Sequence, residues 1–244
     1  MKLEGQFAIV TGASRGIGAE IARHLAAEGA TVALVGRRSE ALEETARSLD
    51  GNRGRIFTAD LRDAPEIAGL SRSVHASFGR VDILVNAAGV WRDEREKFHG
   101  PNLADTPEGQ IDEVVDVGLR ASMLLSRLVL PGMIENRRGK ILQIACGFAG
   151  PHEAKGWLHY YVTNKAIEAF TAGLAAEVRS HEIQVNCIAP WFVASEAVVR
   201  MFPSEAKTAL ATGDVAKLAG FLVSRDADHI SGQTIELRSK LDQT

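Results

Sequence analysis

The sequence has little cysteine: among its 244 residues only Cys146 and Cys187 occur. The two lie far apart, form no CxxC pair and have no neighbouring His and Cys residues, so they match no zinc-binding pattern. Free thiols of this kind fit a reducing compartment best. We therefore expect a cytoplasmic protein without a metal site.

Long runs of one charge are also missing. The sequence holds 28 basic and 31 acidic residues, a net charge of −3 at pH 7, which argues against nucleic acid as a partner. The longest apolar stretch, residues 123–134, is interrupted by Ser126, Arg127 and Pro131, so we expect no membrane span. The chain also enters its first predicted strand at once, which leaves no room for a cleavable leader.

What the sequence does contain is an alternation of short β-branched runs with longer segments of helical period. Strands that are apolar on both faces and separated by helices indicate a parallel sheet covered on both sides. No repeat, low-complexity tract or linker divides the chain, so we expect a single α/β domain over residues 1–244. The predicted strands are residues 7–12, 31–36, 55–60, 81–89, 140–146, 183–190 and 234–237.

Helix signals lie between these strands. Ile17, Ile21 and Leu25 share one face at helical spacing. Asp63 with Pro65, and Thr106 with Pro107, combine an N-cap residue with an early proline, which predicts a helix start at each place.

Two segments do not follow this alternation of strands and helices. Residues 90–105 form a charged stretch whose Trp91 and Phe98 either pack at a subunit contact or cover the substrate mouth. Residues 191–212 are apolar but not periodic, and a long irregular segment beside a cofactor site is often a lid. We expect this segment to form a flap over the pocket, with residues suited to an apolar or ring-bearing ligand: Trp191, Phe192, Val198, Met201 and Phe202.

A glycine-rich turn, "TGASRGIG" (11–18), follows the first predicted strand and leads into a helix. Glycines at such a turn let the backbone approach a pyrophosphate, and the helix N-terminus offers unpaired N–H groups. The spacing differs from G-x-G-x-x-G, but its position in an α/β chain predicts a dinucleotide site.

The end of the second predicted strand favours NADP(H) over NAD(H). An acidic residue at this point would bind a free ribose 2′-hydroxyl, whereas the sequence reads Gly36, Arg37, Arg38. Arg37, with Arg15 from the glycine-rich turn, is suited to a 2′-phosphate. The alternative is that the two arginines are exposed residues at the start of an ordinary helix.

The stretch "YYVTNK" (160–165) contains the two tyrosines of the sequence. Tyr161 and Lys165 are four residues apart, so in a helix they share a face, while Tyr160 looks toward Asn164. By spacing alone, such a pair is usually a half-buried ring beside a solvated charge rather than a catalytic pair.

Four motifs in this order and spacing resemble the short-chain dehydrogenase/reductase family, with members like the 3-oxoacyl-[acyl-carrier-protein] reductases: "TGASRGIG", "VNAAG" (85–89), "YVTNK" (161–165) and "IAPWFVAS" (188–195). The resemblance implies a Rossmann-type three-layer αβα domain with a seven-stranded parallel sheet. It also implies a nicotinamide cofactor, a small-molecule carbonyl or alcohol substrate, and a homodimer or homotetramer.

The resemblance also implies roles for particular residues. Tyr161 would exchange a proton with the substrate oxygen, while Lys165 would lower the pKa of that phenol and hold the nicotinamide ribose. Asp60 and Leu61 would flank the adenine. The implied cofactor-binding residues are Gly12, Ser14, Arg15, Gly16, Ile17, Gly18, Arg37, Asp60, Leu61, Asn86, Ala87, Ala88, Tyr161, Lys165, Pro190, Val193 and Ser195.

Several positions depart from the family pattern. Cys146 replaces a serine that binds the substrate carbonyl, so it is either a weaker donor or a small buried residue. Gly118 replaces a helix asparagine, which suggests a bend or a close approach. Ala87 replaces an asparagine. Trp191 replaces a glycine and would either crowd the nicotinamide pocket or reshape its entrance.

Two hypotheses follow. The first is an NADP(H)-dependent oxidoreductase that interconverts a carbonyl and a secondary alcohol, with Tyr161, Lys165 and Cys146 as its catalytic residues. The second is a nucleotide-binding protein with little or no turnover. The spacing of His152, Glu153 and His159 supports no metal site, and we expect these side chains at the surface.

Overall fold

One seven-stranded sheet organises the computed structural model, which describes residues 1–91, 102–147 and 155–239. All neighbouring strands pair in parallel, in the spatial order β3-β2-β1-β4-β5-β6-β7. The predicted parallel sheet and its seven strands are therefore confirmed, with ends that shift by up to three residues. The strands are β1 (Phe7–Thr11), β2 (Thr31–Gly36), β3 (Gly54–Thr58), β4 (Ile83–Asn86), β5 (Gly139–Ile144), β6 (Ile183–Pro190) and β7 (Thr234–Leu237).

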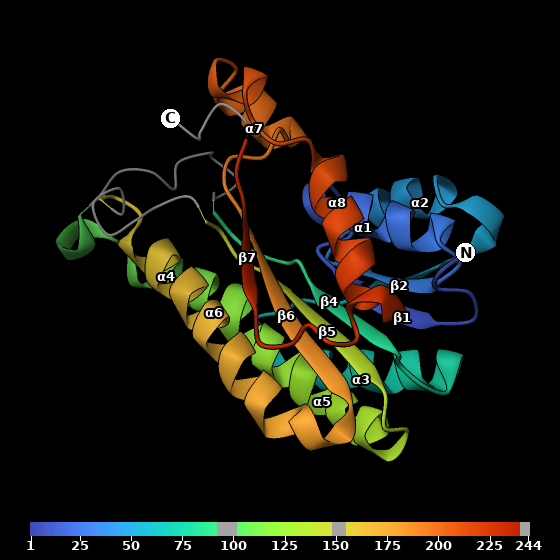
Figure 1. Ribbon diagram of the computed structural model, residues 1–244. Helices are drawn as coiled ribbons and strands as arrows, with labels where there is room; N and C mark the ends of the chain where they lie inside the picture. Colours follow the sequence, from blue (N-terminus) through green and yellow to red (C-terminus); the bar gives the residue numbers. More distant parts are fainter. Residues whose placement is uncertain (92–101, 148–154, 240–244) are drawn as a thin grey trace.

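Helices cover both faces of the sheet (Figure 1). One face is covered by α1 (Gly16–Ala27), α2 (Ser39–Arg47) and α8 (Thr212–Val223), and the other by α3 (Ala64–Phe78), α5 (Ala121–Glu135) and α6 (Leu158–Val178). The helix α4 (Glu108–Val115) continues through a π-helical turn, Asp116–Arg120, into α5. The arrangement is the predicted three-layer αβα architecture.

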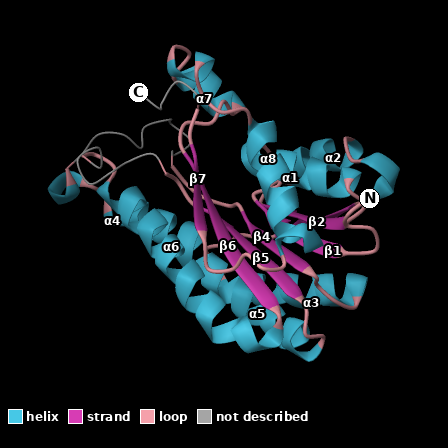
Figure 2. Cartoon of the chain, in the orientation of Figure 1, coloured by secondary structure: helices cyan, strands magenta, loops and turns pink. Residues whose placement is uncertain are grey.

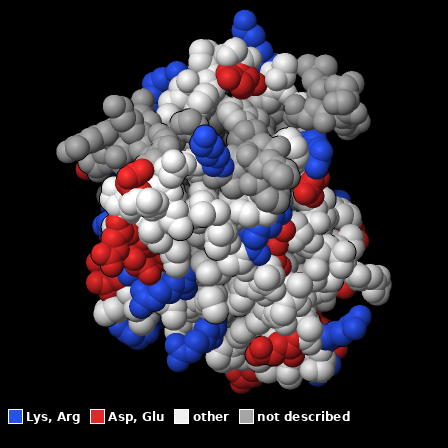
Figure 3. Space-filling model, turned by 90° about the vertical axis from the view of Figure 1, so that its left-hand side faces the viewer, with Lys and Arg blue, Asp and Glu red and all other residues white. Residues whose placement is uncertain are grey.

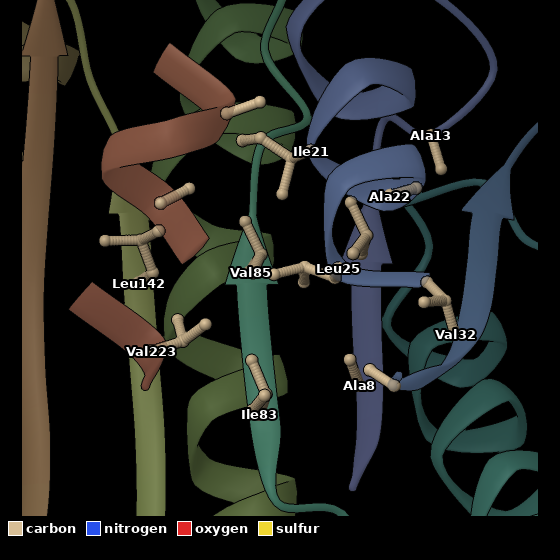
Figure 4. Close-up of a cluster of buried hydrophobic side chains, with 14 of the residues drawn as sticks. Ala8, Ala13, Ile21, Ala22, Leu25, Val32, Ile83, Val85, Leu142 and Val223 are labelled. Carbon is tan, nitrogen blue, oxygen red and sulfur yellow. The ribbon is translucent and has the colours of Figure 1, made fainter. Parts of the chain in front are cut away.

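The strand side chains alternate between two cores because successive residues of a strand point to opposite faces. Ala8, Ile83 and Val85 lie in the core under α1 and α8, where Ile21 and Leu25 pack against them (Figure 4). All five side chains are fully buried. Burying each large aliphatic side chain contributes about 1.5–3 kcal/mol, so the buried face of α1 fixes the helix whose N-terminus forms part of the site.

The two predicted helix starts have different outcomes. Asp63 caps α3 as expected, since its carboxylate accepts the backbone N–H of Glu66 at 3.0 Å and Pro65 follows at the start of the helix. Thr106 does not cap α4: Pro107 is the N-cap residue, and the Thr106 hydroxyl donates backward to the Asn102 carbonyl at 3.1 Å. The Thr106 side chain is drawn into the preceding turn, so the predicted cap is wrong.

The continuous helical segment Glu108–Glu135 is the one part of the described chain long and apolar enough to cross a membrane by length and composition alone. This corrects the expectation that no segment reaches that length. Leu125, Val129 and Met133 of this segment are buried in the core with α3 and α6. Packing in the core thus accounts for part of its apolar character.

The segment predicted as an irregular flap, residues 191–212, is partly regular. It contains α7 (Glu196–Met201), whose N-cap Ser195 accepts the Val198 N–H, and a 3₁₀ turn at Glu205–Lys207. A short bridge between Val193 and Leu210 closes the segment on itself. Figure 2 shows α7 beyond the end of the sheet at which β6 finishes.

Candidate active site

A cavity of about 750 Å³ lies at the carboxyl ends of the strands. In open parallel sheets, ligands bind in the crevice outside these ends, where the strand order reverses. Here the order reverses between β1 and β4. The segments that follow six successive strands each contribute to the wall: Gly12, Arg37, Asp60, Ala87, Cys146 and Trp191.

The glycine-rich turn after β1 is shaped for close backbone approach. Gly12 and Gly16 have φ values of +66° and +59°, a region that favours glycine over other residues. A Cβ on Gly18 would lie 2.4 Å from the Gly12 carbonyl oxygen. Because residue 18 has no side chain, α1 can begin directly against the end of β1. The turn between them forms a cradle that fits a pyrophosphate.

Thr11 ties this turn to the turn after β4. Its buried hydroxyl accepts the backbone N–H groups of Ala87 and Ala88 at 3.0 and 3.1 Å. The ends of β1 and β4, which are distant in sequence, are thus held side by side. Together they form a continuous floor of the cavity where the strand order reverses.

The end of the cavity near β2 carries the predicted cations. Gly36 ends the strand without a carboxylate, and Arg37 lines the cavity and is half exposed. The Asp60 carboxylate is bound by Arg62, and that hydrogen bond is the main cause that holds the pKa of Asp60 below its usual range. Glu113 of α4 lies 3.9 Å from both Arg37 and Arg62.

Most of the predicted cofactor-binding residues lie on the cavity wall. Asn86 does not: it is the last residue of β4 and 3% exposed, and its register partner on β5 is the equally buried Gln143. Its amide side chain lies inside the protein rather than at the cavity. The predicted residues that do line the cavity are Gly12, Ser14, Arg15, Gly16, Ile17, Gly18, Arg37, Asp60, Leu61, Ala87, Ala88, Pro190, Val193 and Ser195.

The tyrosine on the cavity wall is Tyr160. It lies there with Cys146, which follows β5, and with Asn164, one helical turn further along α6. Cys146 and Asn164 both act on the pKa of the Tyr160 phenol, and the Asn164 side-chain amide donates to the Tyr160 backbone carbonyl at 2.8 Å. These three residues form a cluster that can present a phenolic proton to a ligand, and we call it the Tyr160 cluster.

Tyr161 and Lys165 do not line this cavity, so the structure does not place them with the other predicted site residues there, and their catalytic roles stay predictions. Successive helix residues are rotated by about 100°, so one helix cannot point both tyrosines at the same place. The Lys165 ammonium instead binds the Glu168 carboxylate at 2.8 Å, and this hydrogen bond raises the pKa of Lys165. The buried face of α6 consists of His159, Thr163, Asn164, Ile167, Thr171, Leu174, Ala175 and Val178.

The environment of Tyr160 favours the neutral phenol. Burial raises the pKa of Tyr160 well above its usual value near 10, and the adjacent Cys146 thiol raises it further, while a hydrogen bond from Asn164 opposes them. The expected lowering of a tyrosine pKa by a lysine one turn away therefore does not operate at this phenol. At neutral pH, Tyr160 is a proton donor rather than a base.

Gly118 lies in the π-helical turn between α4 and α5 and lines the cavity. A Cβ at this position would lie 3.0 Å from the Thr163 methyl group of α6. Of the two alternatives expected for this glycine, a bend or a close approach, the close approach is observed. π-turns of this kind are frequent at functional sites.

Trp191 lines the cavity together with Cys146. Its ring lies against Gly147, where an added Cβ would meet the indole Cδ1 at 2.8 Å, and the Arg238 guanidinium stacks on it with 4.1 Å between Cζ and the ring centroid. Ser195 lines the cavity, and its hydroxyl accepts the Val198 N–H at 3.4 Å.

Some predicted residues have other outcomes. His159 is 7% exposed, so its expected surface position is wrong, and burial lowers its pKa. His152, Glu153 and Phe98 lie outside the described residues. Among residues 1–91, 102–147 and 155–239, no group of three His, Cys, Asp or Glu side chains could hold a metal.

The sequence-based prediction missed Asn164 and Trp157, both of which line the cavity. A signal for Asn164 was available, because Ile167, Thr171, Leu174 and Val178 recur at spacings of three and four. These residues form one face of the helix. Continued toward the N-terminus at the same spacing, this face includes Asn164 and Tyr160 but not Lys165 and Tyr161.

Known proteins resemble this chain over its whole length. The family model described as short chain dehydrogenase matches residues 6–206. The nodulation protein G of Rhizobium sp. (strain N33) is 33% identical over 98% of each chain. The 3-oxoacyl-[acyl-carrier-protein] reductase FabG of Vibrio cholerae is 31% identical over 97% of each.

Solved structures agree. A 3-ketoacyl-(acyl-carrier-protein) reductase from Brucella melitensis, complexed with NADH, has a TM-score of 0.87 at 27% identity and covers 96% of this chain and 97% of its own. A short chain dehydrogenase from Burkholderia cenocepacia in complex with NADP has the same TM-score and identity and covers 97% and 98%. Both dinucleotides are thus found in similar structures.

Proposed function

The chain belongs to the short chain dehydrogenase family, and from this premise we propose that it reduces a carbonyl group to a secondary alcohol with NADPH, with Tyr160 as proton donor. The family membership gives the coarser class: an NAD(P)-dependent oxidoreductase that acts on CH–OH groups and their carbonyl counterparts. The direction, the cofactor preference and the residue roles are the proposal.

The observation that carries the proposal is the Tyr160 cluster. Of the two tyrosines, Tyr160 is the one on the cavity wall, where it lies together with Cys146 and Asn164. A positioned proton donor contributes about 10²- to 10⁴-fold to a rate. The hydroxyl would give its proton to the substrate oxygen, while the Cys146 thiol would hold that oxygen with a weaker hydrogen bond.

The raised pKa of Tyr160 supports reduction as the favoured direction. Reduction needs the neutral phenol, which is the form present at neutral pH, whereas oxidation of an alcohol needs the phenolate as base. When the dinucleotide is bound, its nicotinamide supplies the hydride. The glycine turn would hold the pyrophosphate, and Val193 and Ser195 would contact the nicotinamide end.

NADPH as the preferred cofactor is supported by the cavity end near β2. Gly36 offers no carboxylate for a ribose 2′-hydroxyl, and Arg15 and Arg37 line the cavity there. Replacing Arg37 with Ala should weaken NADPH binding about tenfold, as expected for the loss of one charge-assisted contact, and leave NADH binding nearly unchanged. An unchanged ratio of the two dissociation constants would remove this assignment.

The test of Tyr160 uses its neighbour as a matched control. NADPH consumption is followed at saturating ketone for Tyr160→Phe and Tyr161→Phe, after fluorescence titration has established NADPH binding in both. We expect kcat to fall about 10²- to 10⁴-fold in Tyr160→Phe and less than about threefold in Tyr161→Phe. The reverse result would support Tyr161 with Lys165, and two unaffected variants would exclude tyrosine catalysis.

A second candidate is a nucleotide-binding protein with little turnover. It is favoured by the binding of Lys165 to Glu168 away from the cavity and by the raised pKa of Tyr160, which the hydrogen bond from Asn164 opposes without reversing. Saturable NADPH binding without consumption across a panel of ketones would select this candidate over the reductase.

We also propose a homodimer or homotetramer. Met123 and Ile134 on α5 and Val162 on α6 are large apolar side chains that are 46%, 36% and 54% exposed. Figure 3 shows wide uncharged areas between clusters of charge on the side formed by α4 and α6. Light scattering on the eluting peak of a gel-filtration column tests the proposal. A mass of about 26.2 kDa would exclude it.

A further inference from the structure

We infer that the substrate is an uncharged ketone that carries an aromatic ring system, held between tryptophan side chains beside Tyr160. The inference rests on the proposed reductase function and names its substrate class. The chain is poor in aromatic residues, at 6% of the sequence, yet all three of its tryptophans line this cavity. The aromatic side chains on the wall are Trp91, Trp157, Tyr160, Trp191, Phe192 and Phe202.

Two tryptophans flank the Tyr160 cluster. The Trp157 ring meets Tyr160 edge to face, with centroids 6.0 Å apart and planes at 62°. Trp191 follows β6 and lies against Gly147, the residue after Cys146. A carbonyl group placed at the Tyr160 hydroxyl would therefore have an indole on the α6 side and another on the β6 side.

The Trp191 ring is fixed by its surroundings. The Arg238 guanidinium stacks on it at 4.1 Å and is itself held by the Glu236 carboxylate at 2.8 Å. Gly147 has no Cβ, which is what permits the indole to lie so close to the strand end. A rigid wall of this kind loses little conformational entropy on binding.

The flap adds a second pair of rings. Phe192 and Phe202 meet edge to face at 5.6 Å, although they lie on either side of α7. Two backbone hydrogen bonds hold the flap closed on itself, from the Ala194 N–H to Leu210 at 2.8 Å and from the Leu210 N–H to Phe192 at 2.9 Å. The aromatic wall is therefore built from separate elements that are braced together.

These walls favour a flat ring over an aliphatic chain. An aromatic contact adds about 0.5–1.5 kcal/mol beyond the area it buries, which corresponds to about 2- to 12-fold in affinity. The charged side chains on the flap part of the wall are of both signs, Glu196, Glu205 and Arg200. Two carboxylates to one guanidinium disfavour an anionic substrate, so the expected ligand is neutral.

The test compares two ketones with the same carbon skeleton. With saturating NADPH, kcat/KM is measured for 2-acetylnaphthalene and for its saturated counterpart 2-acetyldecalin, with an acetoacetyl thioester of N-acetylcysteamine as a chain-like competitor. We expect the naphthyl ketone to be favoured about tenfold over both, near the upper end of the range of about 2- to 12-fold for an aromatic contact. Equal or reversed values with clear turnover would overturn the aromatic inference and leave the reductase intact.

Binding gives a readout that does not depend on turnover. Because all three tryptophans line the cavity, intrinsic fluorescence should be quenched saturably by the naphthyl ketone and not by the decalin. Quenching without NADPH consumption would retain the ligand class while removing the reductase proposal. No quenching together with no preference in turnover would overturn the ligand class.

Single substitutions test which side chain causes the preference for the naphthyl ketone. Trp157→Leu should reduce the naphthyl-to-decalin ratio to below about threefold, and Trp157→Phe should keep most of it because a ring remains. Phe221→Leu is the matched control, since Phe221 is an exposed aromatic of α8 outside the cavity wall. A ratio unchanged in Trp157→Leu would show that this indole does not hold the substrate.

Discussion

The two ends of the cavity are built in different ways. The dinucleotide end, from Gly12 to Arg37, depends mainly on backbone: glycines at positive φ and a helix N-terminus. The reaction end depends on side-chain directions, namely which tyrosine of α6 faces inward and what stands beside it. A backbone site is determined by which residues are glycine, whereas a side-chain site also depends on helix register.

This difference shows where the chain departs from its family. The glycine turn, Asp60 and Ser195 all line the cavity as the resemblance implied. At the reaction end, Gly118, Cys146, Asn164 and Trp191 line the same cavity. The fold and its cofactor cradle can therefore stay constant while the chemistry beside them varies.

The largest effect expected on cofactor binding is at the backbone end. In Gly18→Ala the new methyl would meet the Gly12 carbonyl oxygen at 2.4 Å, so the first turn of α1 must move away from the pyrophosphate cradle. We expect the dissociation constant for NADPH to rise at least about 100-fold, as in the loss of several backbone contacts. Fluorescence titration measures it.

The control for that variant is Gly69→Ala in α3. Its Cβ would have only an ordinary contact, 3.8 Å from the Arg72 guanidinium, and alanine is a better helix residue than glycine by up to about 1 kcal/mol. Affinity should be unchanged and thermal stability equal or higher. Similar NADPH affinity in the two variants would show that the cradle does not depend on Gly18.

The second effect is at the side-chain end. Asn164→Lys would put an ammonium one turn from Tyr160, and an opposite charge at that range lowers a pKa by about 1–3 units. Alcohol oxidation at pH 8 should rise at least about tenfold because more phenolate is present. In the native chain, whose Tyr160 pKa is raised, the oxidation rate should still be climbing at pH 10.

The control for Asn164→Lys is the reverse substitution at the adjacent residue of α6, Lys165→Asn. Since Lys165 binds Glu168 away from the cavity, this variant should keep the native pH–rate profile, recorded from pH 6 to 10.5. A profile that moves in Lys165→Asn and stays fixed in Asn164→Lys would mean that Tyr161 is the titrating phenol.

The sequence predicts the sheet well because its signals are local. Each strand is a β-branched run between turns, and all seven are observed. The glycine turn is equally readable, since glycine at a strand-to-helix junction has a direct structural meaning. Spacing could not choose between two tyrosines, because Tyr160 with Asn164 and Tyr161 with Lys165 are both four residues apart.

Other features of the reaction end depend on distant parts of the chain. The position of Trp191 is set by Gly147 and by Arg238, which lies beyond β7. The burial of His159 depends on the packing of the first turn of α6. These contacts join residues that are far apart in sequence, so no local sequence pattern predicts them. A single sequence also cannot show which distant residues are in contact.

A third, smaller effect concerns the thiol. If Cys146 holds the substrate oxygen, Cys146→Ser should keep or raise kcat, whereas Cys146→Ala should lower it about fivefold, the value of one typical hydrogen bond. Steady-state rates with the same ketone measure this. Equal rates in the two variants would show that the thiol only fills space, and the reaction end would then depend on Tyr160 alone.

The smallest effect concerns side chains at the dinucleotide end. Glu113 lies 3.9 Å from Arg37 and from Arg62, and its charge partly offsets the two cations that a 2′-phosphate would meet. In Glu113→Gln the dissociation constant for NADPH should fall about threefold, while that for NADH stays unchanged. The change is small because exposed ion pairs contribute about 0–1 kcal/mol, and it should shrink at high salt.

Glu108→Gln on the same helix removes the same charge from an exposed position and controls for the net charge of the protein. Because both variants change the overall charge equally, only a local field at the 2′-phosphate separates them. Tighter NADPH binding in Glu113→Gln alone would mean that the cofactor preference, unlike the cradle, is set by side chains. Equal NADPH affinity in the two variants would mean that the Glu113 side chain does not affect the cofactor preference. The dinucleotide end would then depend on its backbone, whereas the reaction end depends on side-chain directions.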